Sequence, residues 1–212
     1  MDYKIVDINK YYRKDVYLRF SDGPKCSISM TYKLDITHLK EVCKERNEKL
    51  NIALLYLVTK AINSRDDYKM YYDFKKNELR SYNVFNVKHY VFNKETEVCK
   101  IVHSKYYLDY KEFYLNTYKD IEEAKKVDFK EDDKEYPDEF DASAMPWVSY
   151  DSFNLELPDG YLYFNPIINW GKFFESSGRT LLPMTIRLNH AIADGYLLSK
   201  FFLIIEDYIK EF

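Results

Sequence analysis

His190 and Asp194 are the residues whose types and spacing most readily support chemistry in this sequence. They lie in the stretch Leu188-Asn189-His190-Ala191-Ile192-Ala193-Asp194-Gly195. An imidazole is the common general base for a hydroxyl at neutral pH, because one nitrogen of the neutral ring carries a free lone pair. The competing interpretation is a buried, hydrogen-bonded histidine beside an aspartate that caps a helix. The spacing alone leaves both interpretations open.

The elements around this stretch favour a site. Residues 181–188 form an apolar run typical of a strand, and residues 196–209 show the apolar periodicity of a helix. A histidine between a strand and a helix presents its ring at the edge of both elements, where ligand sites are commonly built. Asp194 followed by Gly195 fits a turn and the start of the final helix.

The sequence does not contain the motifs of several other common kinds of functional site. Five glycines form no phosphate-binding loop, no serine lies in a nucleophile elbow, and neither His-Glu-x-x-His nor a paired-cysteine pattern occurs. The cysteines are three and widely spaced, which argues against a disulfide framework and a metal site. His38, His89 and His103 lie in polar or helix-start contexts where a histidine is usually incidental. We therefore expect neither a bound metal nor a permanently bound cofactor.

Composition sets limits on partners and location. The net charge of -3 and the absence of a Lys/Arg block argue against nucleic acid. No run of about 18 apolar residues could span a membrane, and the start lacks the apolar run of a signal peptide. We expect a cytoplasmic protein. The 22 tyrosines have two possible explanations: they line a ligand cleft or a subunit contact, or they reflect the codon usage of an AT-rich genome.

Periodicity predicts one α/β domain over residues 1–212. We expect helices beginning near His38 and over 51–63 and 108–126, and a hairpin with a following strand over 68–92. The charged tract 128–141 predicts a solvated loop. Strands are expected over 25–34 and 145–155 and near 161–174 and 180–188, the last three forming a meander joined at Asp159-Gly160 and Ser177-Gly178.

Two segments and several shorter matches carry a family resemblance. Residues 142–155 contain Ser143, Pro146, Trp147 and Phe153 in an order similar to the Ser-Ala-x-Pro-Trp-x-x-Phe-x-Ser-Phe segment of chloramphenicol acetyltransferases. Residues 190–195 resemble that family's His-Ala-Val-x-Asp-Gly signature. Further matches occur in the family's order over the chain: Tyr11-Tyr12-Arg13-Lys14, Cys26 with Ser29-Met30-Thr31, Leu34-Asp35-Ile36-Thr37, Tyr56-Leu57-Val58, Ala61-Ile62-Asn63, Val91-Phe92-Asn93, Glu95-Thr96-Glu97, Pro166-Ile167-Ile168 and Gly171-Lys172.

The resemblance implies a two-layer α/β sandwich with a mixed β-sheet, assembled as a homotrimer with its active sites between subunits. It implies acetyl-CoA as co-substrate and a hydroxylated acceptor, chloramphenicol in the first instance. His190 would be the general base, Ser143 would donate a hydrogen bond to the oxyanion, and Asp194 would pair with Arg13. Trp147 and Lys172 match positions around the CoA channel, while Phe20, Cys26 and Asn169 match positions near the acceptor.

At three positions this sequence differs from the family that it resembles. Asn189 replaces the first of two adjacent histidines, Asn169 replaces a threonine near the oxyanion, and Phe20 replaces a tyrosine of the acceptor pocket. These departures keep a second hypothesis open, the same chemistry on another hydroxylated acceptor. Further alternatives are a non-catalytic binding protein of this fold and the acyltransferase core of a 2-oxo acid dehydrogenase complex.

Overall fold

The computed structural model describes residues 2–126, 134, 136–156 and 162–212. The helices are α1 (Lys14–Asp22), α2 (Thr37–Glu45), α3 (Leu50–Asn63), α4 (Tyr110–Lys126) and α5 (Gly195–Lys210), with a 3₁₀ turn η1 (Asp66–Tyr68). The strands are β1 (Tyr3–Ile5), β2 (Ser27–Asp35), β3 (Met70–Asp73), β4 (Glu78–Tyr82), β5 (Asn86–Asn93), β6 (Val98–Ser104), β7 (Glu139–Met145), β8 (Ile167–Gly171), β9 (Phe174–Ser176) and β10 (Arg179–Asn189).

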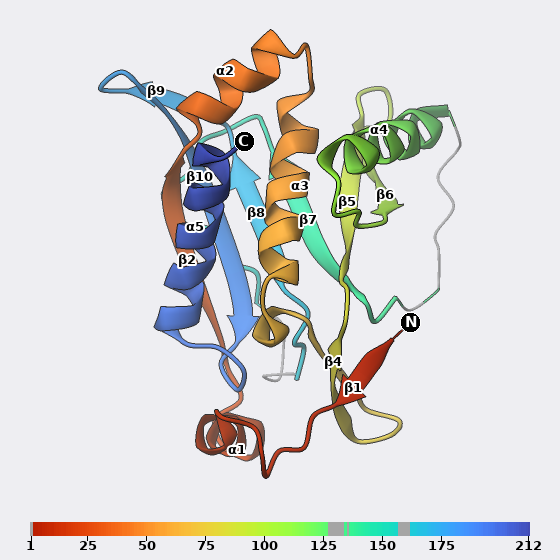
Figure 1. Cartoon of the computed structure of the whole chain (residues 1–212), viewed down its shortest axis with the longest axis vertical. Helices are drawn as coiled ribbons and strands as arrows, with labels where there is room; N and C mark the ends of the chain where they lie inside the picture. The colour runs from red at the N-terminus through yellow and green to blue at the C-terminus, as the bar shows by residue number, and fades with distance from the viewer. Residues whose placement is uncertain (1, 127–133, 135, 157–161) are drawn as a thin grey trace.

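Within the described residues, a seven-stranded mixed sheet is the centre of the fold. Its strand order is β2-β10-β8-β7-β5-β6, with β9 paired to β10. The β5–β7 and β7–β8 pairs are parallel, and the other pairs are antiparallel. A smaller sheet, β1-β4-β3, lies beside one end of it (Figure 1). The predicted α/β fold with a mixed sheet is therefore confirmed.

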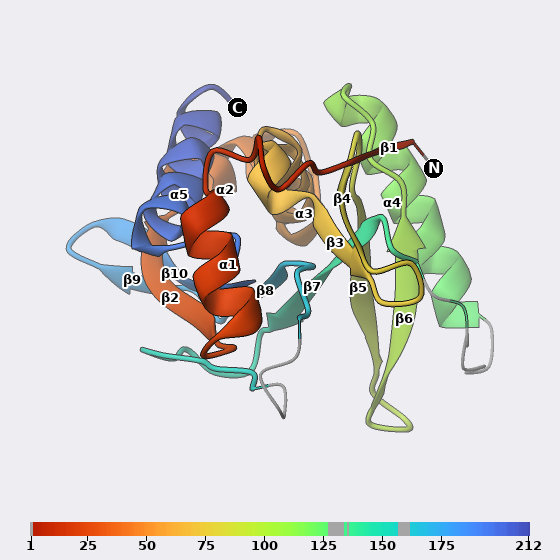
Figure 2. The same ribbon diagram turned by 90° about the horizontal axis from the view of Figure 1, so that it is seen from below.

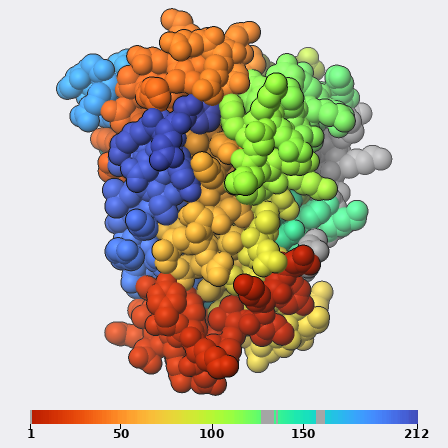
Figure 3. All heavy atoms as spheres, in the orientation of Figure 1, coloured from red at the N-terminus to blue at the C-terminus, as the bar shows by residue number. Residues whose placement is uncertain are grey.

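Helices α2, α3, α4 and α5 cover one face of the large sheet (Figure 2). Helix α3 lies between α5 and α4 and is the most buried of them, with ten buried residues along its length (Figure 3). The sheet face beneath it is apolar: Met184, Ile186 and Leu188 of β10 are fully buried. Because side chains alternate along a strand, the residues between them point to the opposite face, which we call the open face.

The open face carries polar side chains in rows across the strands. Ser143 of β7 pairs with Asn169 of β8, which pairs with Thr185 of β10, which pairs with Thr31 of β2. Thr31 and Thr185 share a hydrogen bond between their hydroxyls, 2.7 Å long. A polar face of this kind is suited to a site or an interface rather than to a core.

The C-terminal strands differ from the sequence-based prediction. Strand β7 ends at Met145, so residues 146–155 are not the predicted strand; Pro146 has no N–H for a sheet ladder. The apolar alternation there has another cause, because the segment crosses the open face and Tyr150 packs on Gly171, where an added Cβ would lie 2.9 Å from the tyrosine ring. The predicted meander is wrong at its first connection, since β7 and β8 are parallel, whereas the antiparallel pairing of β8 and β9 with β10 agrees with it.

The loop, strand and turn predictions around these strands have different outcomes. The charged tract 128–141 is not a loop throughout, because its last three residues begin β7 and pair with β5. Of the expected strand near 161–174, the structure contains β8 and the short β9. The predicted turn at Asp159-Gly160 lies outside the described residues. The turn at Ser177-Gly178 is confirmed, with both residues at positive φ between β9 and β10.

Candidate active site

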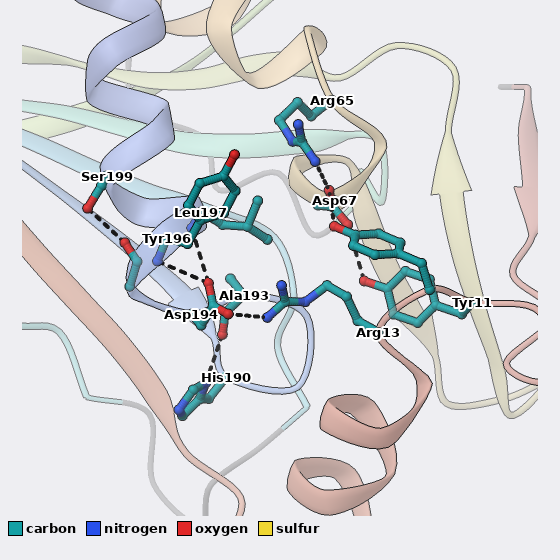
Figure 4. Close-up of polar contacts among 12 residues, drawn as sticks. Tyr11, Arg13, Arg65, Asp67, His190, Ala193, Asp194, Tyr196, Leu197 and Ser199 are labelled. Atoms are coloured by element: carbon teal, nitrogen blue, oxygen red, sulfur yellow. Dashed lines mark hydrogen bonds and ion pairs between the residues drawn. The ribbon is translucent and has the colours of Figure 1, made fainter.

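His190 follows the last residue of β10, in the turn that leads to α5. Its backbone N–H donates to the carbonyl of Cys26, 2.9 Å away, which ties the turn to the segment before β2. Its side-chain Nδ1 lies 2.8 Å from the carbonyl oxygen of Ala193. A carbonyl oxygen can only accept, so Nδ1 must carry the hydrogen. In the neutral ring, Nε2 then has the free lone pair, and it points away from Asp194 (Figure 4).

Phe20 lies against the imidazole. The two ring centroids are 4.0 Å apart and the planes differ by 19°, which is a stacked arrangement. Phe20 is presented by α1, whose Arg19 lies with its guanidinium 5.4 Å from the Phe20 ring centroid. The stacking fixes the plane of the imidazole, while the Ala193 carbonyl fixes its rotation. Phe20 therefore orients the ring by packing rather than by a hydrogen bond.

Asp194 caps α5 and does not contact the imidazole directly. Its Oδ1 accepts from the backbone N–H groups of Tyr196 and Leu197, at 3.0 and 3.2 Å. Its Oδ2 accepts from Arg13 Nη2 at 2.8 Å, so the predicted contact between these residues is present (Figure 4). Burial raises the pKa of Asp194, but the hydrogen bonds from Arg13 and Leu197 lower it more, so the net pKa is below its ordinary value. Because Ala193 precedes Asp194, this cap also places the carbonyl that holds His190.

Replacing Asp194 with asparagine is expected to remove a pH-dependent part of the stability. The folded-state pKa of Asp194 lies below the unfolded value, so its stabilisation is fully present above the unfolded-state pKa and is lost as the pH falls through the folded-state pKa. The side chain is 38% exposed, so solvent screening keeps the effect small, on the order of 1 kcal/mol. Urea unfolding of both proteins at pH 7 and pH 3 measures it. Equal differences at the two pH values would contradict the assignment.

Asn189 and Cys26 stabilise the turn that carries His190 through hydrogen bonds. Asn189 is buried, and its Oδ1 accepts from the backbone N–H of Ala191 at 2.9 Å. Its own carbonyl accepts from the backbone N–H groups of Ile192 and Ala193. The asparagine that stands in place of a family histidine is thus a turn-forming residue here. Cys26 is half-buried and contributes its carbonyl oxygen to the site.

Ser143 lies on the open face and lines a cavity of about 380 Å³. Asn169 shares this cavity, as expected from their pairing across β7 and β8. Its other lining residues are Tyr90, Asp141, Phe153, Leu155, Tyr163 and Ile167. We call this space the Ser143 cavity.

An aspartate at the wall of the Ser143 cavity was missed by the sequence analysis. Asp141 accepts from the hydroxyls of Tyr90 and Tyr163, at 2.8 and 2.9 Å, and pairs with Lys88 at 2.9 Å. Burial, followed by the charge of Asp141, raises the pKa of both tyrosines, so their hydroxyls remain protonated donors at neutral pH. The available signal was the strand period of two, which places Asp141 on the same face as Ser143.

Ser143 and His190 lie far apart within one chain. The row through Ser143 and Asn169 reaches β10 at Thr185, and His190 is five residues further along the chain. Two strand spacings of about 4.8 Å and five rises of about 3.3 Å give a Cα separation of roughly 19 Å. One chain therefore cannot place both side chains on the same reacting group.

Trp147 and Lys172 line a second, more apolar cavity of about 470 Å³. This cavity begins where the sheet divides, because β5 pairs with β7 only through His89 and then continues with β6 alone. Trp147 is 56% exposed and packs edge-on against Phe92, with the ring centroids 4.9 Å apart. The floor comes from Leu50 and Leu54 of α3, and Tyr90 lines both this space and the Ser143 cavity. We call it the Trp147 cavity.

Across the parts of the chain that the structure describes, no group of three or more His, Cys, Asp or Glu side chains could hold a metal ion. In the same residues, no helix is both long enough and apolar enough to cross a membrane.

Comparison with known proteins places this chain among the acyltransferases. The sequence model described as chloramphenicol acetyltransferase matches residues 1–206. A chloramphenicol acetyltransferase of Campylobacter coli is 32% identical over 212 residues, covering 100% of both chains. This protein belongs to the chloramphenicol acetyltransferase family. The predicted family and enzyme class are therefore confirmed.

Solved structures agree on the fold. A chloramphenicol acetyltransferase structure superposes with a TM-score of 0.84 at 21% identity, covering 98% of this chain and 100% of the other. The truncated catalytic core of the 2-oxoacid dehydrogenase multienzyme complex from Thermoplasma acidophilum gives 0.70 at 12% identity, covering 98% of each chain. At these identities the likeness concerns the fold alone, which the two groups share.

Proposed function

We propose that this protein transfers the acetyl group of acetyl-CoA to a hydroxyl of chloramphenicol. The observation that carries the proposal is the imidazole of His190, held by the Ala193 carbonyl and the Phe20 ring so that Nε2 is the free nitrogen. The family adds the substrate class, because relatives that match over 95% and 100% of the chain are named chloramphenicol acetyltransferases. The second candidate is the same reaction on another hydroxylated acceptor, favoured by Phe20, Asn169 and the charged Asp141.

In the proposed reaction, His190 Nε2 takes the proton of the acceptor hydroxyl while the oxygen of that hydroxyl attacks the thioester carbonyl of acetyl-CoA directly. Ser143 Oγ donates a hydrogen bond to the oxyanion that forms at that carbonyl. When the C–S bond breaks, the imidazolium returns its proton to the leaving sulfur and free CoA thiol results. No acyl-enzyme is formed, and His190 ends in its starting state.

The separation of Ser143 and His190 supports a homotrimer with its sites between subunits. If both residues act on one reacting group, Ser143 of one copy must face His190 of another. The open face suits such a contact, because it carries rows of hydroxyl and amide groups instead of a continuous apolar surface. The acceptor would then lie between the Ser143 cavity of one copy and the His190 ring of the next.

The Trp147 cavity is the proposed place for the pantetheine arm of acetyl-CoA. It is mostly apolar, it is lined by residues of β5 and β7 where these strands part, and among its lining residues in the described part of the chain one is a cation, Lys172. An extended thiol-bearing arm needs such an apolar passage, while an ammonium group at its edge can meet a phosphate. Tyr90 separates this cavity from the Ser143 cavity, where the thioester must meet the acceptor.

Replacing Trp147 with alanine is expected to raise KM for acetyl-CoA about tenfold, with KM for chloramphenicol changed less than twofold. The indole ring forms a wall of the cavity, and losing one large aromatic contact costs about 1–2 kcal/mol of binding. Steady-state kinetics with each substrate varied in turn measure both constants. Phe74, which is 47% exposed and does not line this cavity, supplies the matched control Phe74→Ala. Equal rises in both KM values would contradict the assignment.

The direct test of the proposed function is release of CoA thiol, followed with a thiol reagent. Purified protein, acetyl-CoA and chloramphenicol should release thiol in proportion to acetylated chloramphenicol. A panel of other alcohols in the same assay separates the two candidate acceptors. No thiol release with any of them would overturn the proposed function.

A further inference from the structure

The Arg13–Asp194 pair depends on the placement of residues 11–13, which lie in turns closed by backbone hydrogen bonds from Tyr11 N–H to the Ile8 carbonyl and from Lys14 N–H to the Tyr11 carbonyl. Arg13 stands at the N-terminal boundary of α1, with no side-chain cap there. Within the described part of the chain, Nε of Arg13 is buried without a hydrogen-bond partner, and the guanidinium forms its ion pair with Asp194 through Nη2. Side-chain contacts of the neighbouring residues add to these turns in placing Arg13 for this single contact.

The carboxylate of Asp67 holds the two residues that precede Arg13. It accepts from the Tyr11 hydroxyl at 3.2 Å and from the Tyr12 hydroxyl at 2.9 Å, and it pairs with Arg65 Nη2 at 2.9 Å (Figure 4). The Asp67 side chain is 5% exposed, so these contacts are made away from bulk water. We call Tyr11, Tyr12, Arg65 and Asp67 the Asp67 cluster.

Both tyrosines remain donors over the useful pH range. Burial, followed by the charge of Asp67, raises the pKa of Tyr11. Burial, followed by the hydrogen bond to Asp67, raises the pKa of Tyr12. Two neutral hydroxyls and one guanidinium on a single buried carboxylate form charge-assisted hydrogen bonds, which are the stronger kind in proteins. The Tyr12 ring in turn lies 5.9 Å from the Arg13 guanidinium carbon.

The next residue reaches the other side of the same ion pair. Tyr68 follows Asp67 in the η1 turn and is fully buried. Its hydroxyl donates to the carbonyl of Leu197 at 2.7 Å, in the first turn of α5. The N–H of Leu197 donates to Asp194 Oδ1. One short turn therefore contacts the chain beside Arg13 through Asp67 and the chain beside Asp194 through Tyr68.

We infer that Asp67 is a positioning residue for the catalytic base, acting through Tyr11, Tyr12 and Arg13 on the turn that holds His190. The inference rests on the proposed function, since it needs His190 to be the base. Asp67 lines neither the Ser143 cavity nor the Trp147 cavity, so it has no direct contact with substrate in either space. Its effect must therefore fall on kcat and leave both KM values nearly unchanged.

Asp67→Asn tests the inference, because the amide keeps the size of the side chain and removes its charge. The expected result is a fall in kcat of about tenfold, with both KM values within about twofold. The same substitution in an Arg13→Ala background should lower kcat no further, because the path to Asp194 is already broken. A residue with a merely structural role would instead show additive losses. Asp73→Asn is the matched control, since Asp73 is also a poorly exposed partner of an arginine, Arg80.

A second variant and a second measurement distinguish failure of this inference from failure of the proposed function. Tyr12→Phe removes one hydroxyl from a residue that is 67% exposed, so folding is preserved, and it should lower kcat about threefold in wild type but not with Arg13→Ala. Imidazole ¹⁵N NMR, assigned by the signal lost in His190→Ala, reports the Nδ1–H tautomer without substrate. A mixed or reversed tautomer in Asp67→Asn supports the inference even if the acceptor is another alcohol. Unchanged kcat and an unchanged spectrum in both variants would overturn it, whereas an inactive wild type would overturn the proposed function instead.

Discussion

Replacing His190 with alanine is expected to lower kcat for acetyl transfer by about 10³–10⁴-fold, at the upper end of what general-base catalysis supplies. The reason is geometric: the Ala193 carbonyl occupies Nδ1, so Nε2 is the nitrogen available to take the acceptor proton. Stopped or coupled assays of thiol release at saturating acetyl-CoA and acceptor measure kcat for both proteins.

The fold should survive the His190→Ala substitution. Among the described residues, the His190 side chain makes one hydrogen bond and one ring contact, so the loss of stability is on the order of 1 to 2 kcal/mol. His38→Ala, on helix α2, is the control and should retain wild-type kcat. A variant that keeps more than about a tenth of wild-type kcat would show that another group takes the proton.

The sequence was sufficient for the part of the site built from one local segment. Strand, turn, cap and helix around His190 follow from apolar runs and from an aspartate at the start of a helix, all within about thirty residues. The structure adds what types and spacing do not contain. Nothing in the residue order indicates that the Ala193 carbonyl accepts from Nδ1, or that Phe20 of α1 stacks on the ring.

Long-range arrangement was the part that residue patterns could not supply. The order β2-β10-β8-β7-β5-β6 is set by how strands far apart in the chain pair, and it decides that Ser143 and His190 lie at different places on the sheet. Apolar alternation over 146–155 was misread for a related reason. Alternation reports contact with an apolar surface, and here Tyr150 contacts Gly171 while its hydroxyl donates to the Asn169 carbonyl, with no sheet ladder.

The Asp67 cluster shows a second kind of limit. A carboxylate beside Arg65 in a charged turn is usually solvent-exposed, and sequence reasoning assigns it no role. Its burial results from the tertiary contact between η1 and the N-terminal segment, residues about 55 apart in the chain. Such contacts appear in the sequence only as unremarkable tyrosines and an aspartate.

Mixing two inactive variants is expected to restore activity if the active site lies between copies. Ser143→Ala alone should lower kcat by about 10²–10³-fold through loss of an oxyanion donor, and His190→Ala should lower it further. When differently tagged copies are co-expressed and the mixed oligomer is purified, some interfaces join an intact His190 to an intact Ser143. In a random equimolar assembly, half of the copies supply an intact His190 and half supply an intact Ser143. About a quarter of the interfaces therefore join the two, and activity should return to about a quarter of wild type.

The control for the mixing experiment is a pair of substitutions that fall on the same side of the interface. Asp194 holds the turn of His190 in its own chain, so Asp194→Ala mixed with His190→Ala creates no interface with an intact histidine turn. That mixture should show at most the residual activity of Asp194→Ala. Restoration by the first mixture and not by the second is the outcome that the separation of roughly 19 Å between Ser143 and His190 within one chain requires. If neither mixture regains activity although the mixed oligomer forms, Ser143 does not act on the group that His190 activates, and the oxyanion donor must be sought elsewhere on the open face.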